Sequence, residues 1–119
     1  MGKILLFNVN IMKTGLISSL CQKLKHELIL VPEYDYYKTI GELAGLKIPS
    51  QKPHYFNKLP DEMMVFVGFD NISFDNFLKE YKNANIPPIS HKAVMTATNA
   101  NWNVVTLFDD LDEHVKKQK

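Results

Sequence analysis

The sequence predicts a single three-layer α/β domain, in which a four-stranded, mostly parallel sheet lies between helices and the chain closes with a C-terminal helix. Apolar runs that suit strands alternate along the chain with segments of helical period. Two of these runs, residues 3–9 and 63–69, are apolar at successive positions, which is typical of strands buried on both faces. The length of 119 residues suits one domain, residues 1–119.

The first part of the chain reads as strand, helix, strand. Residues 3–9, "KILLFNV", predict the first buried strand. The segment 13–27 carries apolar side chains at spacings of three and four, which predicts a helix that Thr14 caps. Residues 28–36 predict a second strand. Pro32 cannot donate a ladder hydrogen bond, so this strand is expected to lie at a sheet edge or to end there.

A short helix and a long loop follow. Residues 38–46 predict the helix, with Thr39 as its cap and Gly45 as its stop. Residues 47–62 contain three prolines and no apolar period, which predicts a long surface loop. Loops of this length are typically functional, and the aromatic side chains within this one are expected to cover a ligand site.

The second half of the chain begins with the other buried run, residues 63–69. A helical period over residues 70–85 follows it, and Asp70, Asn71 or Ser73 is expected to cap this helix.

The chain closes with one more strand and one more helix. The strand is predicted at residues 92–96 and the helix at residues 102–117, started by Thr98 or Asn99. Residues 116–119 are expected to form a frayed tail.

A second architecture fits the same order of elements. It is a ferredoxin-like α+β fold with antiparallel second and third strands and an extra C-terminal helix. The weak helical signal between these two strands favours it. The strands that are apolar at successive positions favour the three-layer alternative.

Composition narrows the classes of partner. The chain has 14 basic and 13 acidic residues and a formal net charge of +1, so no strong basic field favours nucleic acid or an anionic membrane. The lone cysteine, Cys21, cannot form an intramolecular disulfide, which favours a reducing compartment. The apolar run after Met1 is too short for a signal peptide or a membrane span. These features predict a cytoplasmic protein.

The candidate ligand site consists of polar residues that follow the predicted strands. In a parallel sheet, ligands bind at the carboxyl ends of the strands, where helix N-termini present free N–H groups that favour an anion. The same residue types are those that any helix start selects as caps, so a purely structural role stays open. We call the expected site the predicted rim, and its members are Lys13, Thr14, Asp70, Asn71, Thr98, Asn99 and Trp102.

The sharper signatures of enzymes and metal sites do not occur in the sequence. Neither a phosphate-binding P-loop nor a dinucleotide-binding glycine motif is present. Cys21 lies in the middle of a predicted helix, where a reactive thiolate is not expected. The four histidines are scattered, without the spacing of metal ligands. We therefore expect no cofactor, no metal and no catalytic residue of a recognised kind.

Several phrases, taken in order, resemble a small bacterial domain family of unknown function. They are "LLFNV", "TIGELAGL", "EMMVFVGF" with "FLKEYKNANIPPI", and "KAVMTATNANW". The last phrase is similar to a family pattern of strand, Thr-Pro-Thr-Asn and Trp, with Ala97 in place of the proline. The resemblance implies a stand-alone cytoplasmic α/β domain. It brings no activity, substrate or catalytic residue.

The function expected from the sequence is a binding or regulatory module for a partner protein or a small anionic ligand at the predicted rim. The alternative is a small enzyme that uses His91 or Asp70 as acid or base on a phosphate- or carboxylate-bearing substrate. A homo-oligomer is a third option that the sequence leaves open.

Overall fold

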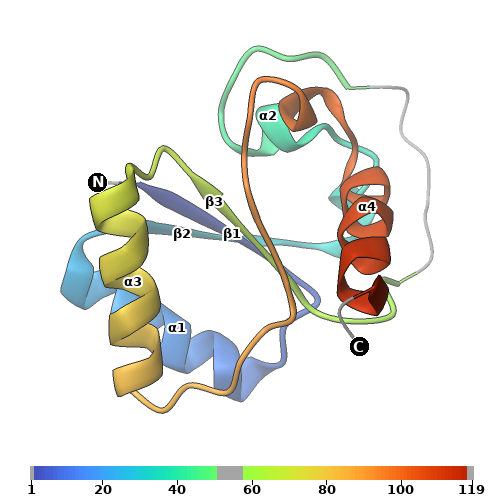
Figure 1. Cartoon of the computed structure of the whole chain (residues 1–119). Coiled ribbons are helices and arrows are strands. Elements are labelled where there is room, and N and C mark those ends of the chain that lie inside the picture. The colour runs from blue at the N-terminus through green and yellow to red at the C-terminus, as the bar shows by residue number, and fades with distance from the viewer. Residues whose placement is uncertain (1, 51–57, 118–119) are drawn as a thin grey trace.

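The computed structural model describes residues 2–50 and 58–117, and within these residues four strands form one sheet between two layers of helices (Figure 1). The long loop expected at 47–62 is described only at its two ends. Its residues 51–57, with Tyr55 and Phe56, lie outside the described residues, as does the end of the tail. The elements, where η marks a turn of 3-10 helix, are β1 (Lys3–Phe7), α1 (Ile11–Leu24), β2 (Glu27–Val31), η1 (Glu33–Asp35), α2 (Ile40–Leu43), β3 (Met63–Val67), α3 (Asn71–Asn83), β4 (His91–Val94), η2 (Asn99–Asn101) and α4 (Val104–Lys117).

The sheet is mixed, with the strand order β2-β1-β3-β4. β1 runs parallel to β2, and β3 runs parallel to β4. The two central strands, β1 and β3, are antiparallel. The chain therefore forms two β-α-β units, joined side by side with opposite strand directions. The prediction of a mostly parallel α/β sheet is confirmed, with one antiparallel pair. The ferredoxin-like alternative is wrong, because β2 and β3 lie on either side of β1 and do not pair.

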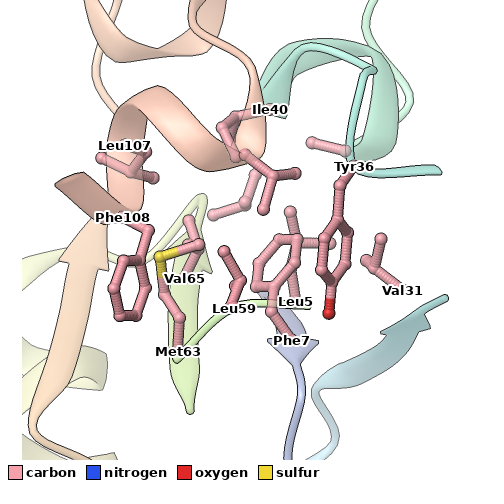
Figure 2. Packing of buried hydrophobic residues seen from close by; sticks show 13 residues of the cluster. Leu5, Phe7, Val31, Tyr36, Ile40, Leu59, Met63, Val65, Leu107 and Phe108 are labelled. Atoms are coloured by element: carbon pink, nitrogen blue, oxygen red, sulfur yellow. The ribbon is translucent and has the colours of Figure 1, made fainter. Parts of the chain in front are cut away.

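Helices cover both faces of the sheet, as the continuous apolar runs predicted. Figure 1 shows α1 and α3 on one face and α2 and α4 on the other. Along β1, Ile4 and Leu6 face the first pair of helices, and Leu5 and Phe7 face the second. Figure 2 shows the cluster of buried side chains on the face that α2 and α4 cover, in which Leu5 and Phe7 lie beside the residues of β3 and below α4. Each fully buried side chain of this kind contributes about 1.5–3 kcal/mol.

Two helices begin at residues other than those predicted. α1 begins at Ile11 because the Asn10 side chain accepts from the backbone N–H of Lys13 at 2.8 Å, so Asn10 and not Thr14 is the cap. α4 begins at Val104, where Asn103 accepts from the N–H of Thr106 at 2.8 Å. Thr98 precedes the single turn η2 and Asn99 begins it, so neither residue starts this helix. Where several Asn and Thr residues stand in a row, tertiary packing decides which one caps.

The other predicted boundaries are close to the observed ones. Thr39 caps the short helix α2, and Gly45 follows it with a φ of 93°, a conformation that glycine adopts at helix ends. β2 is an edge strand and ends at Val31, directly before Pro32. None of the helices among the described residues is long and apolar enough to cross a membrane.

Candidate functional site

The predicted rim is divided between the two ends of the sheet. The prediction of this rim assumed that the carboxyl ends of all strands lie at one edge of the sheet. Because β1 and β3 are antiparallel, the carboxyl end of β1 lies at one end of the sheet and the carboxyl ends of β3 and β4 lie at the other. The structure therefore brings Lys13 and Thr14 together at the first end. The residues at the opposite end are Asp70, Asn71, Thr98, Asn99 and Trp102.

Lys13 is buried and already paired. Its ammonium group lies 2.5 Å from a carboxylate oxygen of Glu62 and 3.2 Å from the carbonyl oxygen of Pro88. The Lys13 side chain is 10% exposed and that of Glu62 is 18% exposed. The hydroxyl of Thr14 donates to the carbonyl of Val9. These contacts hold the start of α1 against the residue before β3, so the positive charge of Lys13 is neutralised within the protein.

Asp70 is the cap of α3, as one of the predicted alternatives had it. Its carboxylate accepts from the Ser73 N–H at 2.7 Å, and the Ser73 hydroxyl accepts from the Asp70 N–H, which completes a capping box. Hydrogen bonds from the Ser73 backbone and side chain hold the pKa of Asp70 below its ordinary value of 3.8. Asn71 is the exposed first residue of α3. The carboxylate therefore occupies the helix N-terminus where an anion was expected.

Asn99 closes the turn after β4. Its side-chain oxygen accepts from the Thr96 N–H at 2.8 Å, and its amide donates to the carbonyl of Val94 at 3.1 Å. Thr98 is exposed beside it. Trp102 packs partly buried against the core below α4, and its carbonyl accepts from the Ile40 N–H at 2.9 Å. Asn99 and Trp102 thus have internal contacts that account for their positions.

His91 lies between the sheet and α4, at the start of β4. Its Nε2 is 2.9 Å from a carboxylate oxygen of Asp112, and its ring stacks on Phe108 with centroids 4.4 Å apart. The other ring nitrogen, Nδ1, is buried and has no hydrogen-bond partner in the described residues, with Asp61 at 3.9 Å. The hydrogen bond from His91, followed by that from Lys116, lowers the pKa of Asp112.

The two residues that the enzyme alternative named as acid or base, His91 and Asp70, do not lie together. His91 pairs in register with Met63 at the start of β3, whereas Asp70 follows the end of β3. The two side chains therefore stand at opposite ends of the sheet. In the part of the chain that the structure describes, no three His, Cys, Asp or Glu side chains gather as metal ligands would.

A large hollow with an apolar floor lies between the C-terminal part of α3 and β4. We call it the α3–β4 groove, and its volume is about 600 Å³. The residues that line it are Met64, Leu78, Tyr81, Lys82, Asn85, Ile86, Pro87, Pro88 and Lys92. The groove exists because α3 covers β3 but leaves the face of β4 open, so that Lys92 and Val94 are exposed.

The floor of the groove is apolar and held in place. Met64 and Ile86 are buried core residues. The Tyr81 hydroxyl donates to the carbonyl of Pro87 at 2.6 Å, which fixes the ring against the turn after α3. Burial, with the charge of Glu62 second, raises the pKa of Tyr81 to about 12, so the phenol stays neutral. An apolar group of a ligand would meet a preformed surface here.

The rim of the groove is basic. Lys82 on α3 and Lys92 on β4 are both exposed. Neither forms an ion pair with any of the described acidic side chains, and the lining contains no Asp or Glu among those residues. The groove therefore combines an apolar floor with two positive charges that remain available for an anionic group.

The hollows at the carboxyl end of β1 suit an anion less well. One, of about 250 Å³, is lined by Asn8, Thr14 and Glu33 among others. A neighbouring one, of about 390 Å³, is lined by Asp61 and Glu62 as well as one lysine. The carboxylates around these hollows repel an anion. Lys13 and Thr14, the residues of the predicted rim at this end of the sheet, therefore do not form the expected anion site.

Sequence reasoning missed the groove. The available signal was the pair of lysines, Lys82 and Lys92, on either side of the apolar "IPPI" phrase. That signal gains meaning only when the end of α3 and the edge of the sheet are known to be neighbours.

One of the comparisons with known proteins gives a match, and it lies in the second half of the chain. Residues 62–115 match a family model described as a domain of unknown function (DUF3783). The expected resemblance to a family of unknown function is thereby confirmed for the segment from β3 into α4, which contains every residue of the α3–β4 groove. No curated protein and no solved structure shows significant similarity to the chain.

Proposed function

We propose that this protein is a binding module whose ligand joins an apolar group to a carboxylate or phosphate, and that the α3–β4 groove holds this ligand. The observation that carries the proposal is the pair Lys82 and Lys92, both exposed and without acidic neighbours in the groove lining, above an apolar floor. This keeps the expected class of function, and it moves the site away from the predicted rim.

The energetics favour a ligand with both parts. Removing a Leu-sized group from water contributes about 2 kcal/mol. An exposed ion pair contributes only about 0.2–1 kcal/mol, so the two lysines alone would hold a small anion weakly. Their effect is to orient the ligand and to select an anion over a cation of the same shape.

The residues of the predicted rim support the move by their contacts. Lys13 is engaged by Glu62, and the Asp70 carboxylate occupies the start of α3. The internal contacts of His91 with Asp112 and of Asp70 with Ser73 favour binding over the enzyme alternative. The proposal retains the cytoplasmic setting that the sequence predicts and the bacterial origin that the family resemblance implies.

Calorimetric titration of the full chain with octanoate tests the proposal, because octanoate joins an apolar chain to one carboxylate. The Lys82→Gln/Lys92→Gln double variant is expected to bind about tenfold more weakly, since two ion pairs of up to about 1 kcal/mol each are lost. Lys79→Gln is the matched control, because Lys79 is an exposed lysine of α3 outside the groove lining. Equal binding by all variants, or no binding by the unaltered protein, would contradict the proposal.

A further inference from the structure

We infer that the ligand is an extended segment of a partner protein, which adds to the sheet beside β4 and places alternate side chains in the α3–β4 groove. This inference rests on the proposed function and names the class of partner.

β4 has an open backbone edge. Its one strand neighbour among the described residues is β3. The Met95 N–H donates to the carbonyl of Phe66 at 2.8 Å, and Val94 is in register with Phe66. In a parallel ladder, successive residues point their backbone groups to opposite sides. The N–H and C=O of Lys92 and the N–H of Val94 therefore point away from β3.

This edge is short and has a defined end. The carbonyl of Val94 accepts from the side-chain amide of Asn99 at 3.1 Å, which closes the edge after Val94. None of the described hydrogen bonds engages the N–H or C=O of Lys92 or the N–H of Val94. Three backbone groups thus remain for an added strand, which is enough for a segment of about four residues, the length of β4.

The side chains of Lys92 and Val94 at the open edge point to the face of the sheet that carries the groove. Lys92 is in register with Met64 and Val94 with Phe66, and both partners face the core beneath α3. Met64 and Lys92 also line the groove. A strand added beside β4 lies about 4.8 Å from it, and every second side chain points to this face. Main-chain bonds to β4 would supply affinity, and the groove would select the side chains.

The surface defines the chemistry of the partner segment. Its side chains toward the groove would alternate between an apolar residue for the floor and an acidic residue for Lys82 and Lys92. Val94, which is 40% exposed, offers an apolar cross-strand contact.

Charge also argues against a symmetric dimer of this chain through the same edge. A second copy of β4 would present Lys92 toward the face that already carries Lys82 and Lys92. Like charges across neighbouring strands destabilise the pair. An acidic segment of another protein would instead place negative charges beside Lys82 and Lys92.

Nuclear magnetic resonance titration of the ¹⁵N-labelled full chain tests the inference. The probe is a short capped peptide in which every second residue is Leu or Glu and the others are Thr. We expect it to shift the amide signals of Lys92 and Val94. A peptide N-methylated at the residues that pair with β4 is expected to bind roughly tenfold more weakly or worse, because it cannot donate to the edge.

Val94→Pro is the matched change in the protein. It removes an outward N–H and leaves the bonds between β3 and β4 in place, since the ladder uses the N–H of Met95. This variant is expected to lose the peptide but to retain octanoate. Should the variant fail to fold, the N-methylated peptide still decides the question.

The outcomes separate the inference from the function on which it rests. Binding of octanoate without binding of the peptide, or equal binding of the methylated and unmethylated peptides, would overturn the inference and leave the proposed function standing. Self-association of the protein that Val94→Pro abolishes would assign the edge to a second copy and also overturn it. Failure of both octanoate and peptide to bind would overturn both.

Discussion

Asn99 shows how a predicted ligand residue is used within the fold. Its side chain bonds the Thr96 N–H and the Val94 carbonyl, so Asn99→Ala leaves two backbone groups without partners. We expect this change to lower the free energy of unfolding by about 2 kcal/mol. Thr98→Ala, one residue away and exposed, is expected to stay within about 0.5 kcal/mol. Urea denaturation measures both values, and equal effects of the two changes would refute the structural role of Asn99.

Asp70 predicts a specific dependence of stability on acid. Because the folded protein lowers its pKa below 3.8, the carboxylate stabilises the fold above that value. This stabilisation disappears as the pH falls through the lower pKa of the folded state. Asp70→Asn keeps a good cap but cannot titrate, so it is expected to lose less stability than the unaltered protein below pH 3.8.

The control for this acid dependence is Asp75→Asn, which changes another exposed carboxylate of α3. Urea midpoints at neutral pH and below pH 3.8 give the comparison. If Asp70→Asn loses as much stability on acidification as the unaltered protein and the Asp75→Asn control, the capping carboxylate contributes nothing to the pH dependence.

The residues that sequence reasoning placed correctly are those with local partners. Asp70 and Thr39 cap helices through backbone groups three residues ahead, and this spacing is visible in the sequence. The partner of Lys13 is Glu62, 49 residues away. Such a pair depends on the position of β3 beside β1, which residue patterns near Lys13 do not encode.

The ion pair of Lys13 and Glu62 joins two elements, the start of α1 and the start of β3. Lys13→Met leaves the Glu62 carboxylate largely buried without its cation, and we expect a loss of about 2–4 kcal/mol in the free energy of unfolding. Adding Glu62→Gln removes the stranded charge and should restore part of that loss. A single variant as stable as the unaltered protein, measured by urea denaturation, would show that the pair does not fasten the two elements.

A side chain of β4 protects the open edge of the sheet from pairing with a strand of another molecule. A charged side chain such as Lys92 hinders the edge-to-edge pairing of strands. Lys92→Ile is therefore expected to self-associate with rising concentration, as measured by analytical ultracentrifugation. Lys79→Ile adds the same apolar group on α3 away from the edge and is expected to have no such effect. Equal self-association of both variants would indicate a general effect of an added exposed apolar side chain and not a property of the edge.

Strand and helix positions followed from periodicity, but the strand directions did not. The runs at β1 and β3 are buried on both faces, and this pattern is the same for parallel and antiparallel neighbours. The direction of β3 depends on the end of the sheet at which the long connection after α2 terminates and β3 begins. The predicted rim required all strand ends at one edge, so one antiparallel pair was enough to divide it.

As a whole, the molecule carries two β-α-β units, and the second contains the groove and the open edge. This second unit and most of α4 together match a domain of unknown function. The central claim is that ligands bind at this groove and not at the loops that follow the strands. Intermolecular nuclear Overhauser effects between octanoate and the methyl groups of the labelled protein test it most directly. We predict contacts to Leu78 and Ile86, and contacts to Thr14 or Thr98 in their place would contradict the claim.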